Sequence, residues 1–259
     1  MTQKERIKIL EDVYAGIYTI DNLPVELYVW TASELFRAVQ KGYRKRLSDL
    51  PVINDEYNLL NQFKRNISIF SGAKMAQEIK DSQNFILDEA GKLRPFKDYL
   101  NDVKSIDALY NEVWLNTERD MAIKRAEAAR YWNDIQSQKN IFPLLKYVTA
   151  GDERVRPGHA ALDGIVKPVN DPFWDKYMPP GDWQCRCQVI QLSEGEENIT
   201  PDNQIAFETI NKDVPTLFRN NPAKVEYIYK TEGYGVHPYM KVEERYQVLK
   251  KNNFNLPEL

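Results

Sequence analysis

The chain is poor in the features that mark several large classes of protein. It has only two cysteines in 259 residues, which excludes a disulfide framework and is typical of a reducing compartment. No apolar run approaches the roughly 18 to 20 residues that a membrane-spanning helix needs. The first residues are charged and lack the apolar segment and cleavage site of a secretory signal. We therefore expect a protein that is cytoplasmic where it is made.

The chain also lacks an excess of either charge. Lys and Arg number 35 and Asp and Glu 38, so the whole molecule has no general attraction for nucleic acid or anionic lipid. No glycine-rich phosphate loop, helix-turn-helix or zinc-finger pattern is present. The basic run Lys41–Arg46 can be interpreted as a contact for DNA phosphates or as the solvated cationic end of a helix, and both interpretations remain open.

Apolar residues at helical spacing dominate the first 140 positions. An N-terminal helix is predicted from Ile7, Leu10, Val13, Tyr14 and Ile17. Thr31 and Glu34 match a capping box, which predicts that a second helix begins there. A third helix is expected from Tyr57, with a weak point at Ser71–Gly72.

The strongest helical pattern covers residues 105–138, after a break at 89–96. Its predicted buried stripe is Val113, Thr117, Met121, Ala128, Trp132 and Ile135. Beyond residue 142 the pattern changes to short β-prone runs at 144–150, 161–169 and 184–192, separated by a Pro-, Gly- and aromatic-rich loop. The sequence therefore predicts an α+β protein: a largely helical region over 1–140, then a small mixed α+β domain over 141–259 with a short antiparallel sheet and a C-terminal tail.

Both cysteines lie close together, at positions 185 and 187. If this segment is an extended strand, the two side chains share one face, and a disulfide between them is disfavoured because the Cα atoms are too far apart. Thiolate and imidazole are ligands that zinc prefers, so Cys185, Cys187 and His159, with Asp152 or Asp163, are a candidate zinc site. The alternatives are thiols buried in the core, thiols with a redox or nucleophilic role, and a histidine hydrogen-bonded within the fold.

Acidic and guanidinium groups are concentrated around the same histidine. Asp152, Arg154, Arg156, Asp163 and Arg186 are expected to form bidentate pairs in a structural network. The functional alternative is an anion or RNA-phosphate site in which His159 and Arg156 act on a phosphodiester, which would need a second acid–base group. No residue is assigned a catalytic role.

Taken in order, these residues resemble the phage Mu F-like head morphogenesis family, also called minor head or minor capsid proteins. The matching residues are Thr149, Asp152, Arg154, Arg156, His159, Leu162-Asp163-Gly164, Pro172-Phe173-Trp174, Pro179-Pro180, Trp183 and Cys185-Arg186-Cys187. The helix that precedes this motif and the later segment "LFRNNPAK" are also similar to the family, although Ala223 stands where the family more often has Gly. The resemblance is sharp over residues 145–193.

The resemblance implies a virion component made in a bacterial host from a phage or prophage. It implies association with the portal protein, with capsid or scaffold proteins as further partners, and a role in head assembly, DNA packaging or DNA delivery. The helical region would then be a docking arm. Non-specific DNA contact is an additional expectation, whereas a membrane, a small-molecule substrate and any cofactor other than zinc are not expected. The alternatives are a virion-delivered enzyme, ribonuclease-like or ADP-ribosyltransferase-like, that uses the Asp152–His159 motif, and a plain DNA-binding module.

Overall fold

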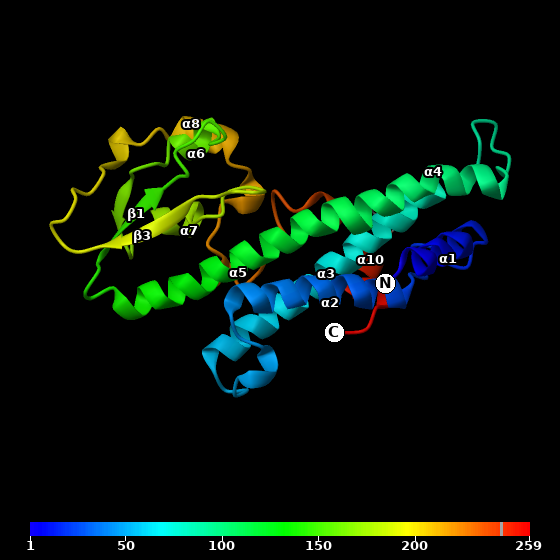
Figure 1. Cartoon of the computed structure of the whole chain (residues 1–259), viewed down its shortest axis with the longest axis horizontal. Helices are drawn as coiled ribbons and strands as arrows, with labels where there is room; N and C mark the ends of the chain where they lie inside the picture. Colours follow the sequence, from blue (N-terminus) through cyan, green and yellow to red (C-terminus); the bar gives the residue numbers. More distant parts are fainter. Residues whose placement is uncertain (244–245) are drawn as a thin grey trace.

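The computed structural model describes residues 1–243 and 246–259, and it places a bundle of long helices beside a small sheet (Figure 1). The helices of the bundle are α1 (Gln3–Tyr14), α2 (Val25–Tyr43), α3 (Asp55–Gln83), α4 (Phe96–Ala108) and α5 (Leu115–Gln138). In Figure 1, α4 and α5 form one long rod, and the sheet lies against the far end of α5. Among the described residues, no helix is long and apolar enough to cross a membrane.

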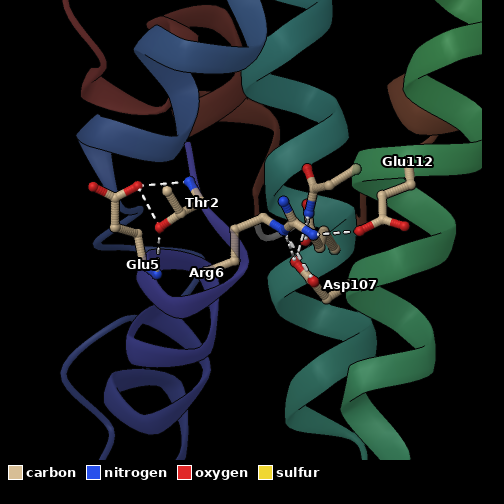
Figure 2. A network of polar contacts seen from close by, with 7 residues as sticks. Thr2, Glu5, Arg6, Asp107 and Glu112 are labelled. Carbon is tan, nitrogen blue, oxygen red and sulfur yellow. Dashed lines mark hydrogen bonds and ion pairs between the residues drawn. The ribbon is translucent and has the colours of Figure 1, made fainter.

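The N-terminal helix α1 is fixed at its start by a local cap and along its length by a buried ion pair. Thr2 and Glu5 form a capping box, in which each side chain accepts a hydrogen bond from the other residue's backbone amide. Arg6 reaches across to α4, where its Nε donates to Asp107 at 2.9 and 3.0 Å. Its Nη2 donates to Glu112 Oε1 at 2.6 Å (Figure 2). The predicted N-terminal helix is confirmed, but it ends before Ile17, which is exposed.

The second helix begins earlier than predicted. α2 starts at Val25, directly after Pro24, and Thr31 is a buried residue in its interior. The prediction of a capping box at Thr31–Glu34 is therefore wrong. The physical reason is that Leu27 and Tyr28 are buried in the bundle, so their apolar contacts favour an additional N-terminal turn of helix over a start at the local capping motif.

The third helix runs without interruption through its predicted weak point. Leu60, Phe63, Ile67 and Phe70 are all fully buried, as their spacing predicts. At Gly72, a Cβ atom would lie 2.6 Å from the side-chain oxygen of Asn253. The glycine thus makes room for the C-terminal segment instead of breaking the helix.

The long helical rod contains an irregular turn that the sequence analysis did not predict. Leu109–Trp114 forms a π-helical stretch between α4 and α5, and such insertions rotate the helix face that follows. Val113, predicted to be buried, is exposed, and Thr117 is only half-buried. From Met121 onward the predicted stripe is confirmed at Met121, Trp132 and Ile135, which are buried. Ala128 is only half-buried, and Ala129 beside it is buried instead.

The C-terminal segment returns to the bundle and contributes to its core. Side chains from this segment that join the main hydrophobic cluster are Phe218, Ile228, Tyr229, Tyr239, Met240, Phe254 and Leu256. A buried ion pair lies beside them: Lys74 Nζ on α3 is 2.5 Å from Glu118 Oε2 on α5. The other oxygen of Glu118 accepts a hydrogen bond from Tyr239 at 3.1 Å. The segment therefore covers both α3 and α5.

The sheet has three antiparallel strands in the order β2-β1-β3, namely β1 (Leu144–Val148), β2 (Val166–Pro168) and β3 (Gln188–Leu192). Leu145 and Tyr147 of the central strand face a second hydrophobic cluster, which also contains Trp132 and Ile135 of α5. The short helices that come after β1 along the chain are α6 (Pro157–Ala160), α7 (Phe173–Tyr177), α8 (Phe207–Asp213), α9 (Pro222–Val225) and α10 (Gln247–Lys251). The predicted α+β fold with a short antiparallel sheet is confirmed, and α7 occupies part of the predicted loop.

Candidate functional site

His159 and the two cysteines meet where α6 approaches the start of β3. His159 is buried, and its Nδ1 lies 3.6 Å from Cys185 Sγ and 3.4 Å from Cys187 Sγ. In the part of the chain that the structure describes, these three residues are the one group of His, Cys and acidic ligand atoms within 4.8 Å of one another. The sequence analysis placed these residues in one candidate site, and the structure brings them together. Asp152 and Asp163 do not belong to the group.

The cysteines converge by a different geometry from the one predicted. They precede β3 instead of lying in it, and Gln184 just before them has a left-handed φ of 56°. The prediction that alternation along a strand aligns the thiols is therefore wrong. The turn directs both sulfurs toward His159, and it is held from α5 by Lys124, whose Nζ donates to the carbonyl of Cys185 at 2.7 Å.

The two thiols are electrostatically coupled. A hydrogen bond from Cys187 lowers the pKa of Cys185 well below its ordinary value, with a further lowering by His159 that acts against burial. The same contact, together with burial, raises the pKa of Cys187. One negative charge is therefore favoured on Cys185, and a second is opposed by the first.

Asp152 and Arg186 form a bidentate ion pair that connects the loop after β1 to the cysteine turn. The two guanidinium nitrogens of Arg186 donate to the two carboxylate oxygens of Asp152, each at 2.6 Å. These hydrogen bonds lower the pKa of Asp152 to about 2. Arg154 is mostly exposed, and its Nη2 lies 3.7 Å from Asp152 Oδ2, which is farther than the nitrogens of Arg186. The pair joins residues 34 positions apart, so it defines the relative position of the two loops.

Other members of the predicted motif make separate local contacts. Arg156 Nη2 donates to the carbonyl of Trp183 at 3.1 Å. Asp163 Oδ1 accepts from the backbone and the hydroxyl of Thr149, at 2.7 and 2.9 Å. Gly164, with a φ of 77°, supplies the left-handed turn that leads into β2.

The two tryptophans of the motif lie apart from the ion pair and from each other. Trp174 is fully buried in the sheet cluster, and its Nε1 donates to the carbonyl of Pro168 at 3.0 Å. Trp183 lies against the helical cluster, with its ring edge-on to Phe218 at 5.2 Å. Their contacts are those of packing residues.

Sequence reasoning missed two residues that support these loops. Lys124 lies within a charged helical stretch, where nothing local distinguishes it from a solvated lysine. Asp213 of α8 accepts from the backbone amide of Gly158 at 2.7 Å. A Cβ at Gly158 would be 2.6 Å from the Cβ of Asp213, so this glycine permits α6 to approach α8. A glycine beside the motif histidine was the only local signal.

The geometry does not favour the acid–base interpretation of the motif. Asp152 pairs with Arg186, and the imidazole of His159 is buried with Nδ1 facing two sulfur atoms. A general base must reach the substrate proton directly or through one water. The arrangement instead fits a cross-link between loops or a site for a metal ion.

A known protein family is similar to the part of the chain that contains this site. The family described as "Phage Mu protein F like protein" matches residues 71–190. Residues 71–190 are similar to this family. The match runs from the middle of α3 to β3 and includes the histidine, both cysteines and the Asp152–Arg186 pair, which confirms the resemblance predicted from the motif.

Two curated proteins are similar to this chain. One is the "Mu-like prophage FluMu F protein" of Haemophilus influenzae, 32% identical over an alignment of 142 residues that covers 48% of this chain and 34% of that protein. The other is the "Putative capsid assembly protein F" of Escherichia phage Mu, 30% identical over 111 residues, 43% of this chain and 23% of that protein. The matched parts thus span about a third or less of these relatives. No solved structure matches the chain significantly.

Proposed function

We propose that this chain is a phage minor head protein that takes part in capsid assembly by binding other head proteins, the portal protein among them. The observation that carries the proposal is the Mu F-like match, because it includes both the α4–α5 rod and the loops joined by Asp152 and Arg186. A relative that is 30% identical over 111 residues is named as a putative capsid assembly protein.

The physical character of the molecule supports a binding role. Preorganised surfaces lose little freedom on association, and the loops near the site are connected by the Asp152–Arg186 pair, the Thr149–Asp163 hydrogen bonds and Lys124. In this role the chain binds portal, capsid or scaffold proteins in the host cytoplasm and is then retained in the virion head.

Non-specific DNA contact inside the head is part of the same proposal. A hollow of about 420 Å³ beyond the end of α2 is lined by Arg37, Lys41, Arg44, Lys45 and Arg46, with Asp49 and Gln40. Cations that neutralise phosphates release counterions from DNA. Binding through this hollow would therefore weaken steeply with added salt and would not depend on DNA sequence.

The decisive experiment is co-expression of the tagged chain with the portal and capsid proteins of its own phage. We expect it to co-purify with the portal and to sediment with assembled heads, whereas a phage lacking its gene forms heads deficient in DNA or infectivity. Normal infectious particles without the protein would overturn the proposal. So would a His159→Ala variant that keeps its fold and head binding but loses a measured RNA cleavage or NAD consumption, since that result would indicate an enzyme.

A further inference from the structure

We propose that His159, Cys185 and Cys187 bind one zinc ion, with His159 contributing Nδ1. This inference goes beyond the assembly role and does not depend on it. The set of one imidazole and two thiolates is chemistry that zinc prefers over calcium or magnesium, whose ligands are oxygens.

The distances fit an ion placed between the three atoms. Zinc–sulfur bonds of about 2.3 Å and zinc–nitrogen bonds of about 2.0 Å at tetrahedral angles place sulfur and nitrogen ligands about 3.5 Å apart. The observed separations from His159 Nδ1 are 3.6 Å to Cys185 Sγ and 3.4 Å to Cys187 Sγ. All three donor atoms, the two sulfurs included, lie within 4.8 Å of one another.

The turn before β3 also directs a backbone amide at one of the sulfurs. The amide of Cys187 donates to Cys185 Sγ at 3.5 Å. Of the two imidazole nitrogens, Nδ1 is the one that lies beside both sulfurs, and Nε2 is buried without a hydrogen-bond partner.

The fourth ligand would be a water molecule. A cavity of about 20 Å³ adjoins the three donors and is also lined by Arg156, Gln184 and Arg186. A cavity needs roughly 10 to 15 Å³ to hold one water, so this one has room for a single water. Two thiolates balance the charge of the ion.

The ion would connect α6 to the turn before β3, which are 26 residues apart along the chain. This cross-link lies beside the Asp152–Arg186 pair. Structural zinc sites contribute directly to folding free energy because the unfolded chain holds the metal poorly. The metal therefore stabilises the same loop arrangement that the Mu F-like motif defines.

The test is the metal content of the full chain purified without chelator under reducing conditions. We expect about one zinc per chain, strong binding being typical of such sites. When cobalt replaces zinc, we expect thiolate-to-cobalt charge-transfer absorption, and both thiols should become reactive only after chelation. Cys185→Ser, Cys187→Ser and His159→Gln should each lower the zinc content more than tenfold. Glu153→Gln, a change at an exposed position of the same loop, should retain it.

The wild-type measurements decide the question even if a variant fails to fold. Zinc below about half an equivalent together with no cobalt charge-transfer band would overturn the proposal. Absence of free thiols after unfolding in chelator would also overturn it, because it would indicate a disulfide. Retention of full zinc content by folded serine variants would show that the metal binds elsewhere.

Discussion

Asn66 is expected to be one of the most sensitive polar positions in the molecule. It lies on α3, nearly fully buried, and its side chain pairs with the backbone of the returning C-terminal segment. Its Oδ1 accepts from the amides of Ile228 and Tyr229 at 2.9 and 2.8 Å, and its Nδ2 donates to the carbonyl of Tyr229 at 2.8 Å. One amide thus satisfies three buried backbone groups.

The Asn66→Ala variant should lose about 3 to 6 kcal/mol of unfolding free energy. The three backbone groups would be left without partners, and an unsatisfied buried group costs about 1 to 3 kcal/mol. The full sum of the three costs is not expected, because the C-terminal segment can shift so that water reaches the unpaired groups. Such a shift is opposed by the ring of Tyr229, which stacks on Phe70 with ring centroids 3.9 Å apart.

The assay is urea unfolding at neutral pH, combined with hydrogen exchange of the amides of Ile228 and Tyr229. The matched control is Asn58→Ala, an exposed asparagine on the same helix, which should change stability by no more than about 0.5 kcal/mol. A loss below about 1 kcal/mol in Asn66→Ala, with unchanged exchange at Ile228 and Tyr229, would refute the reasoning.

Three further changes test the bundle. Burial raises the pKa of Glu78 to about 8 from 4.5, so the folded state holds a proton that the unfolded state releases. The unfolding free energy should therefore fall as pH rises from about 4.5 to 8, by up to about 1.4 kcal/mol per pH unit for this group. Glu78→Gln should remove this contribution and leave that of Glu118, whose pKa burial also raises, while the exposed Glu89→Gln should leave the profile unchanged. Lys74→Met should lower the unfolding free energy in urea by about 3 to 5 kcal/mol, since it leaves Glu118 buried without its cation. The double variant Lys74→Met/Glu118→Leu should recover most of this loss. A double variant as unstable as the single one would contradict the reasoning. Gly42→Ala should lower the unfolding free energy by about 1 to 3 kcal/mol, because the new Cβ would be 2.1 Å from the backbone oxygen of Ile123 on α5. An unchanged melting temperature would contradict this close contact between α2 and α5.

The sequence predicted helices correctly where apolar residues repeat over many positions, and less well where the prediction rested on a short local motif. The repeating apolar positions from Leu60 to Phe70 located α3 correctly because many residues contribute to a stripe. The capping pattern at Thr31 is only two residues and was overridden by burial of the preceding turn. The π-helical stretch before Leu115 has no distinct local pattern, so the rotation that exposes Val113 was not predictable from periodicity.

The candidate site was predictable in membership but not in geometry. The spacing and residue types of His159, Cys185 and Cys187 indicated a shared site, and the structure places their ligand atoms together. The partner of Asp152 depended on how two loops pack, and the sequence offered several arginines for it. Lys124 could not be found at all, because its contact with the carbonyl of Cys185 requires the position of α5 relative to the sheet.

The Mu F-like match ends inside structural units instead of at their borders. α5 contributes Met121 and Ala122 to the helical cluster and Trp132 to the sheet cluster. The matched region therefore supplies part of each hydrophobic core. Other residues of the helical cluster come from α2 and from the C-terminal segment, which lie outside residues 71–190. α2 approaches α5 so closely at Gly42 that no side chain fits between them. Segments outside the match therefore cover surfaces that the matched region cannot bury by itself, and the loops of the motif depend on α5 being held in this bundle (Figure 1).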